Sequence, residues 1–166
     1  MDITIRRIEP GEHAELGELT AQAYLRGGLL DFGVDDPYLA VLRDVAGRAA
    51  GSEVYVAVDG PGTVVGGVAF VPDGGPWADI AGAGEAEFRM LAVSERARGR
   101  GAGEALVRTC VERARAVPGC VRLVLSTQSG MHAAHRIYHR LGFVRTPERD
   151  WEPVPGLGLL TYALEL

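Results

Sequence analysis

A strand, a loop rich in glycine and arginine, and a helix follow one another directly, and this junction constrains the chain more than any other segment. The strand ends near Val93, the loop has the sequence Arg98-Gly99-Arg100-Gly101-Ala102-Gly103, and apolar residues then recur at helical spacing over Ala102–Val117. The first turn of a helix leaves backbone N–H groups without an intrahelical partner, and the helix dipole adds about half a positive charge there. Because glycines let an anion approach the backbone closely, the junction predicts a binding site for a diphosphate group.

The spacing of the glycines narrows the choice of nucleotide. The dinucleotide-binding fingerprint needs G-x-G-x-x-G, whereas here the third glycine, Gly103, comes one position early. The next predicted strand, Val121–Thr127, offers no acidic residue for a ribose, which disfavours an oxidoreductase. The chain also contains no lysine, which excludes a P-loop and Schiff-base chemistry. The pattern that remains is R-x-x-G-x-G at Arg98, Gly101 and Gly103.

Together with two later segments, this pattern resembles the GCN5-related N-acetyltransferase superfamily. The loop follows the strand Glu87-Phe88-Arg89-Met90-Leu91-Ala92-Val93, and further along come Ala134-His135-Arg136-Ile137-Tyr138 and Gly142-Phe143. The segments occur in the family's order and at its separations. The resemblance covers residues 53–146 well and the two ends only by the order of their elements.

The resemblance implies acetyl-CoA as cosubstrate and no metal. The backbone of the loop would bind the diphosphate, and the pantetheine arm would lie between the strand ending at Val93 and the strand 121–127, in the manner of an added strand. A main-chain N–H near Leu91 would polarise the acetyl carbonyl. Met131 stands where relatives often carry an asparagine that bonds the pantetheine, so Ser126, Ser129 or Gly130 would have to replace that contact. The expected cofactor-binding residues are Leu91, Val93, Arg98, Gly99, Arg100, Gly101, Ala102 and Gly103.

Two residues are candidates for the proton transfers of such a reaction. An alkyl amine has a pKa of about 10 and must lose a proton before it can attack, and the departing thiolate gains from a nearby acid. Glu87 is the expected base, because members of the family often carry a glutamate base on this strand, although Glu85 lies on the same face. Tyr138 is the expected acid, since it matches the tyrosine of the A-x-x-[LI]-Y-x-x-x-G-F motif. The alternatives without a catalytic role are a solvent-exposed carboxylate for Glu87 and a core tyrosine for Tyr138.

Patterning along the chain predicts a mixed α/β fold, in which about seven strands form a central, mostly antiparallel sheet flanked by about four helices. The predicted order is β α α β β β α β α β β, and the unit from Glu85 to Thr127 predicts one parallel pair through a right-handed crossover. The predicted strands are 3–8, 53–58, 63–71, 85–93, 121–127, 143–145 and 159–166, and the helices are 11–24, one from Asp36 to about 47 or 51, 102–117 and 131–141.

The sequence therefore predicts an N-acetyltransferase that moves the acetyl group of acetyl-CoA to a primary amine of a small molecule or peptide by direct attack in a ternary complex. The alternative is a non-catalytic CoA-binding or sensory module that kept the loop and lost turnover.

In the family, the region between the first two helices shapes the acceptor pocket. In this chain the region is acidic and aromatic, although an ordinary loop and a capped helix explain these residues equally well. Asp150 and Trp151 either line the same pocket or anchor a hairpin. The residues in that region are Tyr24, Asp31, Phe32, Asp35, Asp36 and Tyr38.

Length, net charge and cysteine content disfavour several other classes of protein. The 166 residues suit a single domain over 1–166, and no stretch reaches the roughly 18 apolar residues of a membrane span or the pattern of a signal peptide, so we expect a cytoplasmic protein. The net charge of −5 predicts no affinity for nucleic acid. Cys110 and Cys120 suggest no disulfide, and a homodimer is left open. His132, His135 and His139 share a helix face that we expect to be solvated, so a metal site there is disfavoured.

Overall fold

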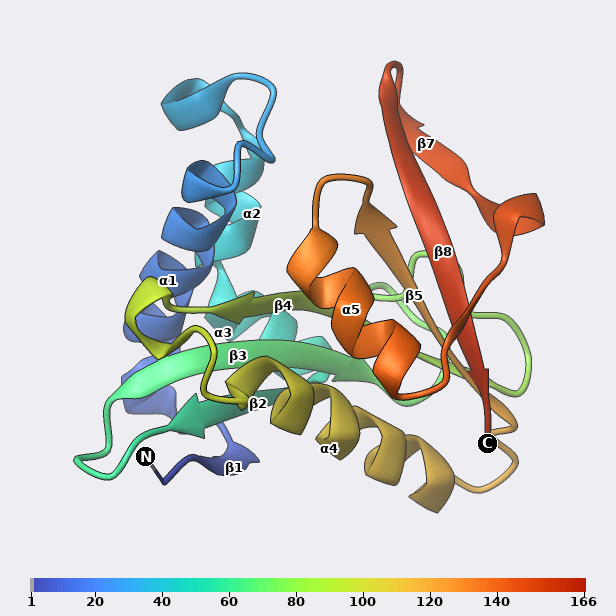
Figure 1. Cartoon of the computed structure of the whole chain (residues 1–166), viewed down its shortest axis with the longest axis horizontal. Coiled ribbons are helices and arrows are strands. Elements are labelled where there is room, and N and C mark those ends of the chain that lie inside the picture. The colour runs from blue at the N-terminus through green and yellow to red at the C-terminus, as the bar shows by residue number, and fades with distance from the viewer. Residues whose placement is uncertain (1) are drawn as a thin grey trace.

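The computed structural model describes residues 2–166, and its sheet has the strand order β1-β2-β3-β4-β5-β8-β6, with β7 paired to β8 (Figure 1). Only β4 and β5 are parallel; the other described pairs are antiparallel. This confirms the mixed α/β fold and the predicted parallel pair. The strands are β1 (Thr4–Arg7), β2 (Glu53–Val58), β3 (Val64–Val71), β4 (Glu85–Val93), β5 (Arg122–Gln128), β6 (Val144–Arg145), β7 (Trp151–Val154) and β8 (Leu157–Glu165). The α-helices are α1 (His13–Arg26), α2 (Tyr38–Arg43), α3 (Val45–Gly51), α4 (Ala102–Ala116) and α5 (His132–Arg140).

The sheet is buried on both faces, and strand β2 shows how the sequence achieves this. Successive side chains of a strand point to opposite faces. Tyr55 and Ala57 join the core under α4 and α5, whereas Val54, Val56 and Val58 join a second core under α1 and α3. Figure 1 shows α4 and α5 on one side of the sheet and α2 and α3 on the other. The run of apolar residues from Val54 to Val58 is therefore what a central strand requires.

Two elements differ from the sequence prediction. The helix expected from Asp36 to about residue 47 or 51 is two helices, because Asp44 leaves the helical conformation at φ −83° and ψ 66°. Its Oδ1 accepts a 3.0 Å hydrogen bond from the Gly47 N–H, so the side chain caps a new helix instead of continuing the old one. The second difference is the extra strand β7, which pairs with the early part of β8. The observed order is β α α α β β β α β α β β β.

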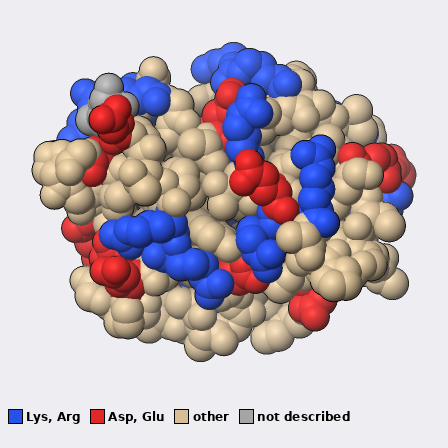
Figure 2. Space-filling model, turned by 90° about the horizontal axis from the view of Figure 1, so that it is seen from below, with Lys and Arg blue, Asp and Glu red and all other residues tan. Residues whose placement is uncertain are grey.

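Charged side chains on the surface are mixed in sign. On the face seen in Figure 2, arginines are interspersed with acidic residues. Several of them form ion pairs, such as Arg6 with Glu12 at 2.8 Å and Arg113 with Glu53 at 2.8 Å. None of the helices within residues 2–166 is long and apolar enough to cross a bilayer.

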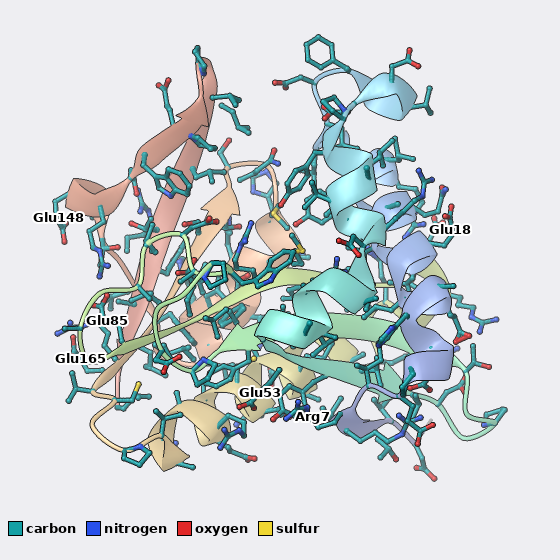
Figure 3. All side chains as sticks on the ribbon, turned by 180° about the vertical axis from the view of Figure 1, so that it is seen from behind. Arg7, Glu18, Glu53, Glu85, Glu148 and Glu165 are labelled. Atoms are coloured by element: carbon teal, nitrogen blue, oxygen red, sulfur yellow. The ribbon has the colours of Figure 1, made fainter. Side chains whose placement is uncertain are left out.

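A buried ion cluster holds the start of β4. Glu85 is 7% exposed and accepts from Arg149 at 2.8 Å and from Arg122 at 2.9 Å. Arg122 also bonds Glu165, which lies beside Glu85 in Figure 3. These arginines, Arg149 foremost, lower the pKa of Glu85 from 4.5 to about 2. A carboxyl whose pKa is lowered by folding stabilises the folded protein at pH values above the pKa that the carboxyl has in the unfolded chain. This stabilisation is lost as the pH falls from about 4.5 toward about 2.

We therefore expect Glu85→Gln to lower the free energy of unfolding at pH 7 by about 3 kcal/mol and to flatten its decline between about pH 4.5 and pH 2. Glu18→Gln is the matched control, because Glu18 is exposed and pairs with Arg43 on the distant helix layer. Urea unfolding across this pH range measures both. If the free energy of unfolding declined equally with falling pH in the Glu85→Gln variant and in the unmutated protein, the cluster would contribute nothing to stability.

Candidate active site

Strands β4 and β5 separate halfway along their length. Their parallel pairing extends only over Glu85–Glu87 against Arg122–Val124, although β4 continues to Val93 and β5 to Gln128. On the other side of β4, two residues, Met90 and Leu91, oppose the single residue Val68 of β3. This is a β-bulge, and Met90 adopts the left-handed conformation at φ 58° that such an extra residue permits. The bulge therefore lies in the part of β4 that is not paired with β5.

A cavity of about 800 Å³ lies where the glycine- and arginine-rich loop meets the diverging strands, and we call it the loop cavity. It is lined by Leu91–Val93 of β4, by the loop itself and by the start of α5. Of the eight residues predicted to bind the cofactor, seven line it. These are Leu91, Val93, Arg98, Gly99, Gly101, Ala102 and Gly103; Arg100 lies outside the lining.

Two glycines shape the loop for close approach to its backbone. Gly101 is the N-cap of α4 at φ 84°, a left-handed conformation that strains other residues. Its carbonyl accepts the first helical bond from Ala105, so the N–H groups of residues 102–104 have no intrahelical partner. A Cβ at Gly103 would lie 3.0 Å from Ile137 Cδ1, and Ile137 also lines the loop cavity. The geometry leaves donors at the positive end of a helix facing an open cavity.

Arginines add positive charge to the loop cavity. Arg98 and Arg136 line it without an ion pair to any residue within 2–166. Arg140 also lines it, but pairs with Glu104 at 2.9 Å. A cavity with unpaired N–H donors and two unneutralised guanidinium groups suits a ligand with phosphate groups.

A second cavity of about 670 Å³ lies on the other side of the strand separation, and we call it the tyrosine cavity. Tyr24, Tyr38 and Tyr138 line it, together with Arg89–Leu91 of β4 and Ser126–Gln128 of β5. The two cavities share Tyr24, Leu29, Leu91 and Met131. They therefore meet where β4 and β5 part.

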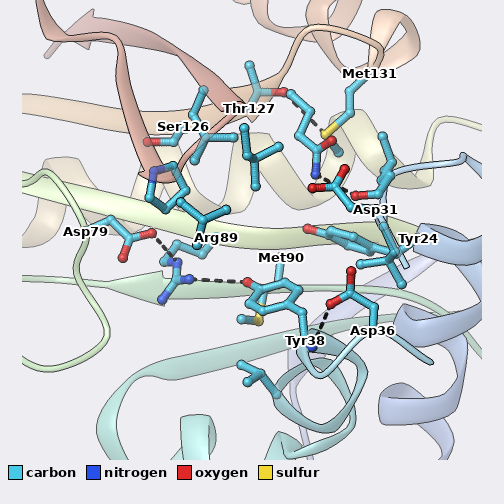
Figure 4. A pocket seen from close by; sticks show the side chains of 18 of the residues that line it. Tyr24, Asp31, Asp36, Tyr38, Asp79, Arg89, Met90, Ser126, Thr127 and Met131 are labelled. Atoms are coloured by element: carbon cyan, nitrogen blue, oxygen red, sulfur yellow. Dashed lines mark hydrogen bonds and ion pairs between the residues drawn. The ribbon is translucent and has the colours of Figure 1, made fainter. Parts of the chain in front are cut away.

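The region between α1 and α2 contributes to this second cavity. Tyr24, Asp31, Phe32, Asp36 and Tyr38 line it, whereas Asp35 does not. The Asp36 carboxylate also caps α2, accepting from the Tyr38 N–H at 2.9 Å (Figure 4). Trp151 of β7 lines the same cavity, and its indole N–H donates to Ser126 Oγ at 3.0 Å. Asp150 instead pairs with Arg145 at 2.7 Å.

Tyr138 comes from the buried face of α5 and is 2% exposed. Its ring packs against Phe88, Phe143 and Tyr162 at centroid distances of 5.5 to 5.9 Å. Burial raises the pKa of the Tyr138 phenol, so the hydroxyl remains a neutral donor. The residue lines the tyrosine cavity, and no hydrogen bond joins its hydroxyl to another residue within 2–166.

Glu87 lies deeper than the sequence suggested and lines neither cavity. It is fully buried, and its Oε1 accepts three 3.0 Å hydrogen bonds from the N–H groups of Asp79, Ile80 and Ala81. Oε2 has no partner, and burial raises the pKa of the carboxyl. Glu87 thus holds the segment 79–81 in place, a contact that no motif in the sequence indicated.

Of the remaining site residues, His135 departs from the sequence analysis. His135 is half-buried rather than solvated, because its Nε2 lies 3.2 Å from Thr127 Oγ1 and 3.1 Å from the Gln128 carbonyl. Met131, which replaces the family's asparagine, lines both cavities. Gly130 also lines the loop cavity, but Ser126 and Ser129 do not. Within residues 2–166, no three His, Cys, Asp or Glu side chains are arranged to hold a metal.

Arg89 is the site residue that sequence reasoning passed over. It precedes the bulge, and its side chain enters the tyrosine cavity (Figure 4). Its Nε pairs with Asp79 Oδ2 at 3.0 Å, and its other nitrogens donate to the Trp77 carbonyl and the Tyr38 hydroxyl. The available signal was a third charged residue on β4, after Glu85 and Glu87, with apolar residues on either side of it in the sequence.

The fold agrees with comparisons to known proteins. A family model described as Acetyltransferase (GNAT) family matches residues 18–143. A GNAT-family acetyltransferase from Staphylococcus aureus Mu50 matches with a TM-score of 0.76 and 15% identity over 99% of each chain. A candidate acetyltransferase from Salmonella typhimurium, solved with its cofactor acetyl-CoA, has a TM-score of 0.68 and 26% identity over 100% of this chain and 95% of that one.

A GNAT-superfamily phosphinothricin acetyltransferase from Sinorhizobium meliloti, in complex with acetyl-CoA, has a TM-score of 0.72 and 19% identity over 100% of this chain and 89% of its own. The comparison with curated proteins gave no match. The family model spans well over half of the chain and includes the loop, the separated strands and Tyr138. The chain therefore belongs to the GNAT family of acetyltransferases.

Proposed function

We propose that this chain is an acetyl-CoA-dependent N-acetyltransferase that acts on a primary amine of a small molecule or peptide by direct attack in a ternary complex. The observation that carries the proposal is the meeting of two cavities where β4 and β5 part. One has the donors and charge that a CoA diphosphate needs, and the other has polar and aromatic walls suited to an acceptor. Acetyl-CoA in the Salmonella and Sinorhizobium structures supports the choice of cosubstrate.

In this proposal the N–H groups at the start of α4 hold the diphosphate of acetyl-CoA, and Arg98 and Arg136 neutralise phosphate charge. The edges of β4 and β5 that face each other without pairing bond the pantetheine arm through the backbone of Leu91 and Val93. This places the thioester where the cavities meet, beside Leu91 and Met131. A main-chain N–H near Leu91, freed from the ladder by the bulge, polarises the acetyl carbonyl.

Two protons have to move in the reaction. The amine loses one as its nitrogen attacks the acetyl carbon, and the C–S bond then breaks to release CoA as a thiolate that takes up a proton. Tyr138 is the proposed donor to the sulfur, since its hydroxyl is neutral and at the cavity wall. Glu87 is the proposed base. Because it lines neither cavity, the proton reaches it through water.

Glu87→Gln tests that role. The amide oxygen can still accept from residues 79–81, so we expect the fold to survive while kcat at pH 7 falls about tenfold. Burial raises the pKa of Glu87, so its base form, and with it the rate, should increase with pH on the acidic limb of kcat/KM; this limb should vanish in the variant. Steady-state rates across pH measure this, with the exposed Glu148→Gln as control. An unchanged kcat and pH profile would leave Glu87 only its role in holding the segment 79–81.

Thiol release from acetyl-CoA across a panel of amines tests the function itself. The proposal expects CoA release that depends on a particular amine and a product heavier by one acetyl group. If acetyl-CoA binds and no amine accelerates its cleavage, the alternative of a CoA-binding or sensory module is supported instead. A cytoplasmic location and a homodimer stay predictions.

A further inference from the structure

The tyrosine cavity carries opposite charges at its two ends. In Figure 4, Arg89 lies at one side of the cavity with Asp79, and Asp31 lies at the other side near Met131. Met131 also lines the loop cavity, so the Asp31 side is the one that adjoins the proposed acetyl group. The Arg89 side is the far end. A ligand that filled the cavity would therefore meet an acidic group near the reaction centre and a guanidinium away from it.

Arg89 has donors left for a ligand. A guanidinium has five N–H donors. Within residues 2–166, one nitrogen pairs with Asp79 at 3.0 Å, one donates to the Trp77 carbonyl at 3.1 Å and one donates to the Tyr38 hydroxyl at 3.4 Å. Two N–H groups thus remain without a protein acceptor, and the side chain is 18% exposed in a cavity wall. Charge-assisted bonds from such a fork favour a carboxylate or a similar oxyanion.

The guanidinium is also fixed in place before any ligand binds. Asp79, its carboxylate partner, belongs to the segment whose three N–H groups are held by the buried Glu87. Tyr38 belongs to α2, whose first turn is capped by Asp36. Both partners are therefore held by their own backbones, so little side-chain entropy remains to be lost on binding.

A second arginine adds positive charge behind this end of the cavity. Arg48 is 1% exposed and forms no ion pair with a residue in 2–166; it donates instead to the carbonyls of Val41 and Leu42. It interacts electrostatically with Tyr24 and Tyr38, which form the cavity wall. Both guanidinium groups act on this wall, against the carboxylate of Asp79, which pairs with Arg89, and that of Asp44, which acts on Arg48 without an ion pair. A buried guanidinium without an ion pair is costly, and an acidic group on the ligand would offset that cost.

We propose that the amine acceptor carries an acidic group, a carboxylate or a similar oxyanion, and that Arg89 binds it. The inference rests on the proposed acetyl transfer for the identity of the acceptor, but the binding of the acidic group can be measured separately. Arg89 precedes Leu91 by only two residues, which corresponds to about 7 Å along a strand. The amine and the acidic group of one small molecule can therefore reach the acetyl group and Arg89 together, as in an amino acid.

The experiment compares amino acids with their primary amides. Binding is measured in the presence of CoA, and turnover is measured with acetyl-CoA. The amide's amine loses its proton more readily, so a preference for the acid cannot come from amine basicity. For at least one pair we expect kcat/KM and affinity to favour the acid by about tenfold. In Arg89→Gln the preference should fall to about one, and in Arg89→Lys it should be intermediate. Arg43→Gln, which removes an exposed guanidinium paired with Glu18, should keep the full preference.

If Arg89→Gln does not fold, Tyr38→Phe replaces it, since loss of one acceptor that orients the guanidinium should raise KM severalfold for the acid and leave the amide unaffected. Amides that bind and react as well as acids, a preference that survives in folded Arg89→Gln, or binding by neither member of any pair would each overturn the inference. Acid binding that depends on Arg89 without any acetylation would keep it and reject the proposed transfer. Acetylation of amines with no preference for the acid would support the proposed transfer and overturn the inference about Arg89.

Discussion

Gly103→Asp should weaken acetyl-CoA binding about 100-fold while the protein remains folded. A Cβ at residue 103 points toward Val93 and Ile137, which line the loop cavity, so the added carboxylate would lie beside the diphosphate and cover the N–H donors of α4. Two like charges about 4 Å apart near a protein surface repel by about 4 kcal/mol, enough for such a loss. Folding should tolerate the change, because aspartate is favourable in the first turn of a helix and the 3.0 Å neighbour is the end of the flexible Ile137 side chain.

Isothermal titration with acetyl-CoA measures this effect, and thermal melting shows that the variant is folded. Gly60→Asp is the matched control, since it introduces the same charge at a glycine with no atom within 4 Å of an added Cβ, in the turn between β2 and β3. A natively folded Gly103→Asp variant that binds acetyl-CoA as well as the unmutated protein does would mean that the phosphates do not lie on this turn.

Tyr138→Phe should lower kcat about 100-fold and change KM for acetyl-CoA little. The ring would keep its packing against Phe88, Phe143 and Tyr162, so only the hydroxyl is lost. Because burial raises the pKa of this phenol, it stays protonated across the neutral range. The wild-type rate should therefore show no fall on the alkaline side that is due to Tyr138, and the variant should be slower by a similar factor from about pH 6 to about pH 9.

Steady-state kinetics with a fixed acceptor measure this, with Tyr55→Phe as control. Tyr55 is also buried, but its hydroxyl donates to Glu53 and it lines neither cavity. If Tyr138→Phe turned over at the wild-type rate, Tyr138 would be a core residue alone, and solvent would supply the proton to the thiolate.

The loop and the strands around it were predictable because their information is local. Glycines at 99, 101 and 103 directly before an amphipathic helix determine a turn with exposed N–H groups, whatever the rest of the fold does. The parallel pairing of β4 and β5 also followed from the sequence, since two strands joined by a helix of fifteen residues form a right-handed crossover.

What the sequence could not supply were side-chain contacts that form only in the folded chain. No motif indicates that residues 79–81, although close to Glu87 in the sequence, fold back to donate three hydrogen bonds to it, so a buried loop anchor resembled an accessible base. Arg89 had no assigned role in the sequence, because its contacts with Asp79, Trp77 and Tyr38 form only in the folded chain. The break at Asp44 was missed because apolar spacing continues across it, and only the side-chain cap to Gly47 separates α2 from α3.

The most direct test of the proposed reaction centre is a crystal structure of the protein with acetyl-CoA. We expect the diphosphate within hydrogen-bonding distance of the N–H groups of residues 102–104, and the acetyl group between β4 and β5 beside Leu91. Phosphates bound away from the start of α4, or a thioester that does not enter the opening between these strands, would contradict the account.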